Sequence, residues 1–311
     1  MSRGNIMKKT ISFVIPTYNE EENVSLLVEG ITTIMKTELL EYDYEIIFAD
    51  NHSTDRTREV IRALCSENKN IKAIFNARNF GLFRSPIYGL KQALGDCVIR
   101  MCADFQDPLE MIVTFVREWE KGYKIVIGVK KSSQENKIVY WLRTCYYKLS
   151  SKLMDIDHIE HFTGFGLYDK RFVDVIRDLS DPLPYFRGIV AELGFDYKMI
   201  SYEQPRRRAG KSKNNWSRLY EYAMVGLVSY AKKWPKAMFF AGFGVGVADI
   251  IFTLACLWRH AFCWDAGIFM LVLFLMAMQL FFMGIIGEYL IGLNTRILNR
   301  PLVVEEERIN F

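Results

Sequence analysis

The sequence predicts an α/β fold, in which a mainly parallel sheet is covered by helices on both faces and is followed by a membrane-associated helical region. Three observations support this prediction. Short apolar runs alternate with segments of helical periodicity in the first third of the chain. Polar clusters follow these apolar runs. Two apolar stretches that are long enough to span a bilayer lie near the C-terminus of the 311 residues.

Four apolar runs are predicted to be buried strands, at residues 11–15, 44–49, 71–75 and 97–102. The helices expected between them cover residues 19–36, 53–67 and 85–94. The acids at 20–22 favour the first turn of the first helix, and Ser53 is expected to cap the second. Ligands of such sheets bind at the carboxyl ends of the strands, so the polar residues there are the candidates for a site.

The composition is that of a partly hydrophobic, mildly basic chain. Half of the residues are hydrophobic, the net charge is +4 and the mean hydropathy is +0.04. The basicity fits a partner that carries phosphates, or an anionic membrane surface; we expect no nucleic-acid partner. The six cysteines form no CxxC pair, which is typical of reduced thiols in a cytosolic protein. The N-terminus has no long apolar segment, so we expect no cleavable signal peptide.

The C-terminal third predicts a membrane anchor. Residues 214–234 are amphipathic and are expected to form a helix in the membrane interface, although a core-facing helix would show the same pattern. Residues 238–258 and 266–287 are each long enough to cross a bilayer, and the short connector between them implies a helical hairpin. Buried helices of a soluble protein are the alternative. Asp249 lies inside the first span, where a carboxylate is functional or forms a local pair.

The charges that flank the two spans predict their orientation. Basic residues precede the first span and follow the second: Lys232, Lys233, Lys236, Arg296 and Arg300. The positive-inside rule therefore places both chain ends in the cytosol, with Arg259 in the outer loop as a contrary signal. We expect a multi-pass protein of the cell inner membrane whose catalytic domain is cytosolic.

Three polar clusters follow the first three predicted strands. Residues 15–20 (IPTYNE) turn the chain at Pro16, and their backbone groups can face a nucleotide base; a plain strand-to-helix turn is the alternative. Asp50 can accept hydrogen bonds from ribose hydroxyls or a base edge. Arg78 can meet a phosphate, and Gly81 permits close approach of the backbone to a ligand; a surface loop with an incidental arginine is the alternative.

Two further clusters suggest metal and phosphate chemistry. Residues 102–110 group acidic and amide oxygens just beyond the fourth strand, and such oxygens suit Mg²⁺ or Mn²⁺ bridging a diphosphate. As an alternative to metal binding, Asp107 and Pro108 can simply begin a helix; this alternative suits Asp107 well but Asp104 poorly. Residues 206–213 (RRRAGKSK) concentrate positive charge before the amphipathic segment, as a lipid-headgroup patch or as a lid over phosphates.

Taken in order, these motifs resemble family 2 glycosyltransferases, and most closely the branch of dolichyl-phosphate mannose synthase and the bactoprenol glucosyltransferases. The resemblance covers residues 15 to about 301 and includes the motifs IPTYNE, DNHSTD, RNFG, ADFQDP, FTGFGLYD, YFRG, RRRAGKSKNNW and GEYL. It implies a GT-A nucleotide-sugar-binding domain with a mainly parallel sheet, and single inverting transfer of a sugar to a lipid phosphate.

The resemblance also implies roles for individual residues. Donor binding falls to Pro16, Tyr18, Glu20, Asp50, Asn51, Arg78 and Asp104. Metal binding, of Mg²⁺ or Mn²⁺, falls to Asp104 and Gln106. Contacts to phosphates or lipid fall to Arg187, Arg206, Arg208, Lys211, Ser212 and Lys213. The residues expected to be catalytic are Asp104, Arg206 and Lys211.

The sequence departs from the family pattern in three places. Cys102 stands where the family usually has an acid, and a thiolate is a poor partner for Mg²⁺. Asn51 replaces the second acid of the nucleotide motif. Residues 163–166 lack the acid that some relatives carry there, so no general base can be named. A polyprenyl phosphate needs none, because it is already ionised near neutral pH.

The sequence thus predicts an enzyme that transfers a sugar from a nucleotide diphosphate, a UDP-sugar by resemblance, to polyprenyl phosphate at the cytosolic membrane face. The expected parts are a catalytic domain (1–205), a basic loop with an interfacial helix (206–236), a transmembrane hairpin (237–293) and a cytosolic tail (294–311). Gly242, Gly244 and Gly246 would permit close helix packing in a homo-oligomer. The alternatives are a different acceptor, which would require a general base, or a catalytically silent scaffold that binds nucleotide sugars.

Overall fold

The computed structural model describes residues 8–131, 159, 161–205, 207–208, 216–230, 240, 242–244, 247–248, 251 and 264–311. Within this part of the chain, eight strands form one sheet in the order β7-β5-β6-β4-β1-β2-β3-β8. The strands are β1 (Thr10–Thr17), β2 (Asp43–Asp50), β3 (Ile71–Asn76), β4 (Cys97–Arg100), β5 (Ile125–Lys130), β6 (Phe162–Asp169), β7 (Tyr197–Tyr202) and β8 (Glu305–Ile309).

The four predicted strands form the centre of the sheet, which confirms the α/β fold. Strands β4, β1, β2 and β3 pair in parallel, with Thr17 opposite Asp50 at the carboxyl end of the β1–β2 ladder. Strand β6 runs antiparallel between β4 and β5, and β8 runs antiparallel to β3 at the sheet edge. The loops that follow β1, β2, β3 and β4 therefore emerge at one edge of the sheet.

Helices cover both faces because the central strands are apolar on both sides. The helices are α1 (Val24–Thr37), α2 (Thr57–Glu67), α3 (Gly81–Gln92), α4 (Met111–Glu120), α6 (Lys170–Asp178), α7 (Phe186–Glu192), α8 (Trp216–Tyr230) and α10 (Trp264–Leu298). One core cluster joins α1, α2 and α4 to Phe13, while the other joins α3, α6 and α7 to its neighbour Val14. Burial of each large apolar side chain of these clusters contributes about 1.5–3 kcal/mol to the free energy of folding.

Two local predictions were wrong. The acids at 20–22 do not lie in the first turn of α1, because that helix begins at Val24 and they belong to the preceding turn. Ser53 does not cap α2, whose N-cap is Arg56. The Ser53 hydroxyl instead donates to Asp50 and accepts from the N–H of Asn19. The strand-end carboxylate competes for the hydroxyl and draws it away from the helix.

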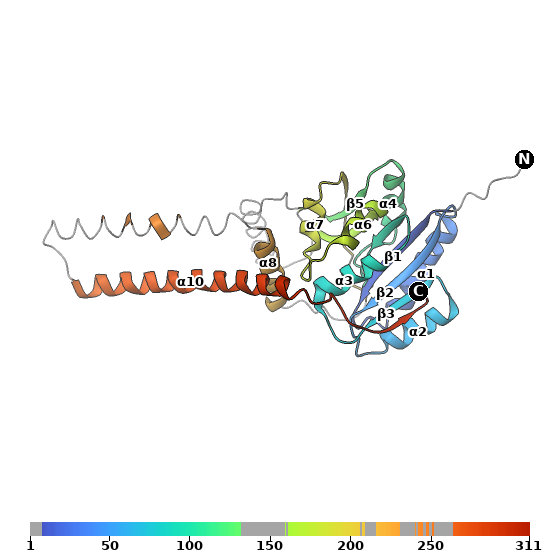
Figure 1. Cartoon of the computed structure of the whole chain (residues 1–311). Coiled ribbons are helices and arrows are strands. Elements are labelled where there is room, and N and C mark those ends of the chain that lie inside the picture. Colours follow the sequence, from blue (N-terminus) through green and yellow to red (C-terminus); the bar gives the residue numbers. More distant parts are fainter. Residues whose placement is uncertain are drawn as a thin grey trace, which may run out of the picture.

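Helix α10 extends away from the sheet (Figure 1). The most apolar 18 residues of its segment Phe274–Leu298 have a mean hydropathy of 1.8, and none of them is buried. Among the described residues, this is the one helix long and apolar enough to cross a membrane. The second predicted span, 266–287, falls within α10. Most of the first span, including Asp249, and the Gly246 position lie outside the described residues, so the predicted hairpin stays a prediction.

The segment assigned from the sequence to a cytosolic tail is partly a strand. After α10 ends at Leu298, the chain returns to the sheet and forms β8 beside β3 (Figure 1). Asn310 fastens this end by donating from its side-chain amide to the carbonyl oxygens of Cys65 and Ile71, at 2.7 and 2.8 Å. Residues near the C-terminus therefore form one edge of the sheet.

Candidate functional site

The loops after β1 and β2 are held together by hydrogen bonds. The N–H of Asn19 donates to Ser53 Oγ at 2.8 Å, and the Asn19 side-chain oxygen accepts from the N–H of Thr54 at 2.7 Å. The N–H of Glu20 donates to Thr57 Oγ1 at 2.8 Å. Asn19 has φ of 56°, in the left-handed region that asparagine tolerates better than most residues. The two motifs IPTYNE and DNHSTD thus form one continuous rim.

Asp50 supports this rim from beneath. Its carboxylate is fully buried and accepts from Ser53 Oγ at 2.5 Å and from the Ser53 N–H at 3.1 Å. Burial raises the pKa of Asp50, while the hydrogen bonds from Ser53 and the charge of Arg58 act in the opposite direction. With its oxygens turned to the protein, Asp50 holds the loop in place in this structure.

Asn51 joins the rim to the loop after β3. Its Oδ1 accepts from the N–H of Phe80 at 2.8 Å, and its Nδ2 donates to Asn79 Oδ1 and to the carbonyl of Gly81, each at 3.0 Å. An aspartate could not make the two donor bonds. Both donor bonds therefore require the amide at this position. The guanidinium of Arg78 lies 4.2 Å from the centre of the Phe80 ring on the same loop.

Asp104 lies in the loop after β4, where its side chain is 13% exposed. Its Oδ1 accepts from the N–H of Gln106 at 3.2 Å. Its Oδ2 lies 3.9 Å from the Nη2 of Arg207, and the same guanidinium donates to the Glu20 carboxylate. Arg207 therefore bridges the loop after β1 and the loop after β4.

The basic segment continues over the β4 loop with Arg208. Its N–H donates to the carbonyl of Asp104 at 3.4 Å, and its guanidinium lies 5.3 Å from the centre of the Phe105 ring. The prediction named Arg206, Arg208, Lys211, Ser212 and Lys213 from this segment; of these, only Arg208 falls within the described residues. Arg207 was missed. The arginine run indicated the segment, but an irregular loop has no periodicity that would say which of its side chains turns inward.

Asp107 is buried below the same loop. One oxygen accepts from the N–H of Cys102 at 2.8 Å, and the other accepts from the Tyr202 hydroxyl at 3.3 Å. Burial raises the pKa of Asp107 to about 6, and the charge of Asp104 acts in the same direction. Asp107 shapes the loop, while Cys102 is exposed beside it.

The described residues contain no group of three or more His, Cys, Asp or Glu side chains arranged to hold a metal ion. One or two carboxylates are nevertheless enough for Mg²⁺ when substrate phosphates and water supply the other oxygens. Asp107 is committed to its own hydrogen bonds, so Asp104 is the carboxylate of this loop that fits such an ion. Gln106 contributes a backbone N–H to Asp104.

Arg187 lies in the first turn of α7, beside the carboxyl end of β4. Its neighbour Phe186 packs against Arg100, whose guanidinium is 4.8 Å from the ring centre. Pro16 pairs with Ala49 within the sheet, and Tyr18 follows directly in the rim. The structure therefore gathers the predicted residues of β1, β2, β3 and β4 at one edge, with Arg187 on the neighbouring helix.

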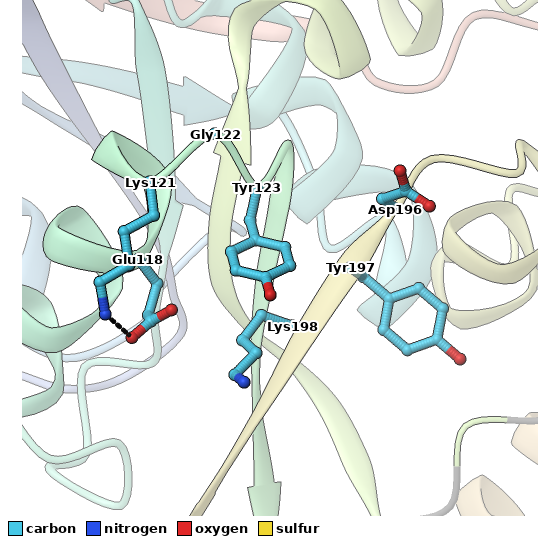
Figure 2. Close-up of a pocket in the computed structure, with 7 residues that line it drawn as sticks. All are labelled: Glu118, Lys121, Gly122, Tyr123, Asp196, Tyr197 and Lys198. Carbon is cyan, nitrogen blue, oxygen red and sulfur yellow. Dashed lines mark hydrogen bonds and ion pairs between the residues drawn. The ribbon is translucent and has the colours of Figure 1, made fainter.

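A separate cleft of about 630 Å³ lies elsewhere (Figure 2). It is lined by Glu118, Lys121, Gly122, Tyr123, Asp196, Tyr197 and Lys198. These residues lie just before β5 and at the start of β7, which run parallel to each other, so the cleft lies at the amino ends of these strands. It lies away from the carboxyl-end loops that carry the candidate site.

Comparisons with known proteins agree with the arrangement of the motifs. The family described as "Glycosyl transferase family 2" matches residues 12–193. The Bacillus subtilis protein CsbB is 33% identical over 285 residues, which cover 90% of this chain and 86% of that one. The bactoprenol glucosyl transferase of Shigella phage SfV is 28% identical over 96% of this chain and 99% of its own length.

One solved structure that is similar to this chain is glucosyl-3-phosphoglycerate synthase from Mycobacterium tuberculosis, in complex with Mn²⁺, UDP and phosphoglyceric acid. It has a TM-score of 0.46 and 18% identity, and the match covers 70% of this chain and 78% of that one. The family match alone spans more than half of the present chain and includes the loops after β1, β2, β3 and β4. The chain belongs to glycosyl transferase family 2 and is a glycosyltransferase.

Proposed function

We propose that this glycosyltransferase moves a sugar from a UDP-sugar to a polyprenyl phosphate at the cytosolic face of the cell inner membrane. The observation that carries the proposal is the position of Arg207 between Glu20 and Asp104, at the carboxyl end of the parallel strands. A cation flanked by carboxylates suits a diphosphate that arrives with a divalent ion. The full-length similarity to bactoprenol glucosyl transferases supports the lipid acceptor.

The proposed chemistry is a single displacement. A phosphate oxygen of the lipid attacks the anomeric carbon, the bond between this carbon and the diphosphate oxygen breaks, and UDP leaves with the electron pair. The new bond joins sugar and lipid phosphate with inversion. No proton has to be removed from the acceptor, which agrees with the absence of an acidic residue in β6 before its last position, Asp169.

The residues of the site divide this work. Arg207 and Arg208 stabilise the negative charge that develops on the leaving diphosphate. Asp104 would hold a Mg²⁺ or Mn²⁺ ion, which neutralises diphosphate charge when it is bound. Arg187, on α7, is proposed to meet the acceptor phosphate. Arg206, Lys211, Ser212 and Lys213 extend the proposed phosphate contacts along the basic segment.

Helices α8 and α10 are proposed to hold the site at the level of the lipid headgroups. They meet at hydrogen bonds from Tyr220 to Glu288, at 3.0 Å, and from Arg296 to Ser229, at 2.8 Å. Arg296 also lies 3.6 Å from Asp181, which precedes α7. These contacts join the apolar helix, the amphipathic helix and the catalytic domain. A lipid phosphate at the membrane surface would then be held in a fixed orientation relative to the site. We propose that the first span completes a two-helix membrane anchor.

A thermal-shift panel tests the donor and the metal together. A ligand that binds the folded state raises its apparent melting temperature. The purified chain should be stabilised by UDP or a UDP-sugar with Mg²⁺ or Mn²⁺, and Asp104→Asn should lose the part of the shift that depends on the metal. An acceptor assay then compares polyprenyl phosphate with polyprenol. Transfer of the sugar to polyprenol but not to polyprenyl phosphate would contradict the proposed acceptor.

A further inference from the structure

Strand β8 carries a β-bulge that redirects one glutamate. Phe75 of β3 pairs with Glu307, but the next residue, Asn76, pairs with Glu305, so Glu306 is an extra residue in the ladder. Regular alternation would send Glu306 and Glu307 to opposite faces of the sheet. Instead, both carboxylates reach arginines of α2. The bulge therefore brings two acidic side chains to the face that α2 covers.

The two arginines that receive these glutamates differ in what lies behind them. Glu307 pairs with Arg62 at 2.7 Å. Glu306 pairs with Arg58 at 2.7 Å, and the Nε of Arg58 lies 3.4 Å from the buried Oδ2 of Asp50. The Arg58 side chain is only 16% exposed, and its Nε makes no hydrogen bond within the described part of the chain. Arg58 thus connects the C-terminal strand to Asp50, whereas the Arg62 pair ends at the surface of α2.

From Asp50 the contacts continue into the proposed donor loops. Asp50 accepts from Ser53 Oγ, and Ser53 Oγ in turn accepts from the N–H of Asn19. The next residue, Glu20, binds Arg207 beside Asp104. Because Asp50 is fully buried, its orientation can affect a bound ligand only through the position of these loops. A change in the position of Arg58 would therefore shift the turn that carries Glu20.

We propose that Arg58 and Glu306 are positioning residues for the donor: the C-terminal strand holds Asp50, and through it the Asn19–Glu20 turn, in the arrangement that binds a nucleoside diphosphate. The inference rests on the proposed function, since it requires a nucleotide donor at these loops. It gives the segment after α10 a part in donor binding, although this segment lies far from the donor loops in sequence.

The test measures the dissociation constant of UDP by calorimetry on the full-length purified chain, with the melting temperature recorded for each variant. Glu306→Gln removes the charge that pairs with Arg58. Glu307→Gln is the matched control, because it makes the same change one residue later in the same strand and removes only the Arg62 pair. Arg58→Gln and the double variant Arg58→Gln/Glu306→Gln complete a double-mutant cycle.

We expect Glu306→Gln to weaken UDP binding about fivefold, with Glu307→Gln close to wild type. The double variant should bind no more weakly than Arg58→Gln alone, because Glu306 acts through Arg58. Equal UDP affinities for Glu306→Gln and Glu307→Gln would overturn the inference. It would also be overturned if both variants lost affinity only in proportion to a lower melting temperature, because general destabilisation would then explain the loss. Failure of the wild-type chain to bind any nucleoside diphosphate would instead refute the donor site itself, and the inference with it.

Discussion

Arg207 donates to the carboxylate of Glu20 and lies 3.9 Å from that of Asp104, so one guanidinium spans the first and fourth strand-end loops of the sheet. The three residues are far apart in sequence and come from three different motifs. The planar fork of arginine can serve two acceptors at once, which a lysine ammonium does with less directional preference. This bridge places a fixed positive charge beside the carboxylate that fits a divalent ion.

The first prediction concerns Arg207. Replacement by alanine should lower kcat/KM for the nucleotide sugar about 100-fold, because a preorganised charge at the leaving diphosphate is lost. Arg207→Lys should retain part of the activity. Initial-rate measurements at several donor concentrations check this. Arg117→Ala is the control, since Arg117 pairs with Glu41 at the protein surface; equal activities of Arg207→Ala and Arg117→Ala would contradict the prediction.

The second prediction concerns the missing acid at Cys102. The thiol is exposed two residues before Asp104, so Cys102→Asp adds a carboxylate where a divalent ion could reach it. More ligand charge raises affinity for such ions, and the Mn²⁺ concentration that gives half-maximal activity should fall about tenfold. Cys102→Ser changes the side chain without adding charge and should leave this concentration unchanged. A metal titration of activity in which both variants behave alike would rule out a carboxylate effect.

The third prediction follows from the pKa of Asp107, which burial raises to about 6, compared with about 3.9 in an unfolded chain. The folded state binds this proton more tightly, so the associated stability is present below pH 4 and is lost as the pH rises through about 6. Asp107→Asn should therefore be more stable than wild type at pH 8, by about 3 kcal/mol, with a flatter pH dependence. Melting temperatures across this pH range measure the effect.

Asp169 supplies a control of opposite sign for the Asp107 experiment. Burial disfavours its charge, but hydrogen bonds from Trp119 and from the N–H of Arg171, together with the charge of Lys124, outweigh burial and lower the pKa of Asp169. Its contribution to stability is therefore present above the unfolded pKa and is lost in acid. Asp169→Asn should be less stable than wild type at pH 8. If Asp107→Asn were also destabilised at pH 8, the assignment of a raised pKa to Asp107 would be wrong.

The fourth prediction concerns the junction between α7 and α8. A methyl group on Gly188 would collide with the Tyr230 ring, and the Tyr230 hydroxyl donates to Glu192 at 3.0 Å. Gly188→Ala should therefore cost about 1–3 kcal/mol of stability, because the ring is displaced. Gly284→Ala is the control, since an added methyl group there meets no atom within 4 Å. A melting temperature of Gly188→Ala at or above that of Gly284→Ala would contradict the packing described.

The central strands could be predicted from the sequence because burial on both faces leaves unbroken apolar runs such as residues 11–15. The edge strand β8 could not be predicted. Its sequence, EEERI, is charged and resembles a solvated tail. It is held by its pairing with β3, by the side chain of Asn310 and by ion pairs with Arg58 and Arg62 of α2. Local sequence cannot register partners that lie more than two hundred positions away.

The same limit applies to hydrogen bonds around the candidate site. Ser53 has the chemistry of a helix cap, but the buried Asp50 three residues earlier takes its hydroxyl. The expectation that Asp50 accepts hydrogen bonds from ribose hydroxyls or a base edge stays a prediction; in the structure its oxygens face Ser53 and Arg58. The strand-end motifs named from the sequence do lie together at one edge of the sheet, as parallel strands require. Which side chain turns outward depended on hydrogen bonds between loops.

The most direct measurement of the central claim is mass spectrometry of the lipid fraction after the purified full-length chain has been incubated with polyprenyl phosphate, a UDP-sugar panel and Mg²⁺ or Mn²⁺. The proposed function predicts a polyprenyl phosphate that gains one sugar from one donor, with release of UDP, and no such product with Asp104→Ala. An unmodified lipid with every donor in the panel, or an equal yield from Asp104→Ala, would contradict it.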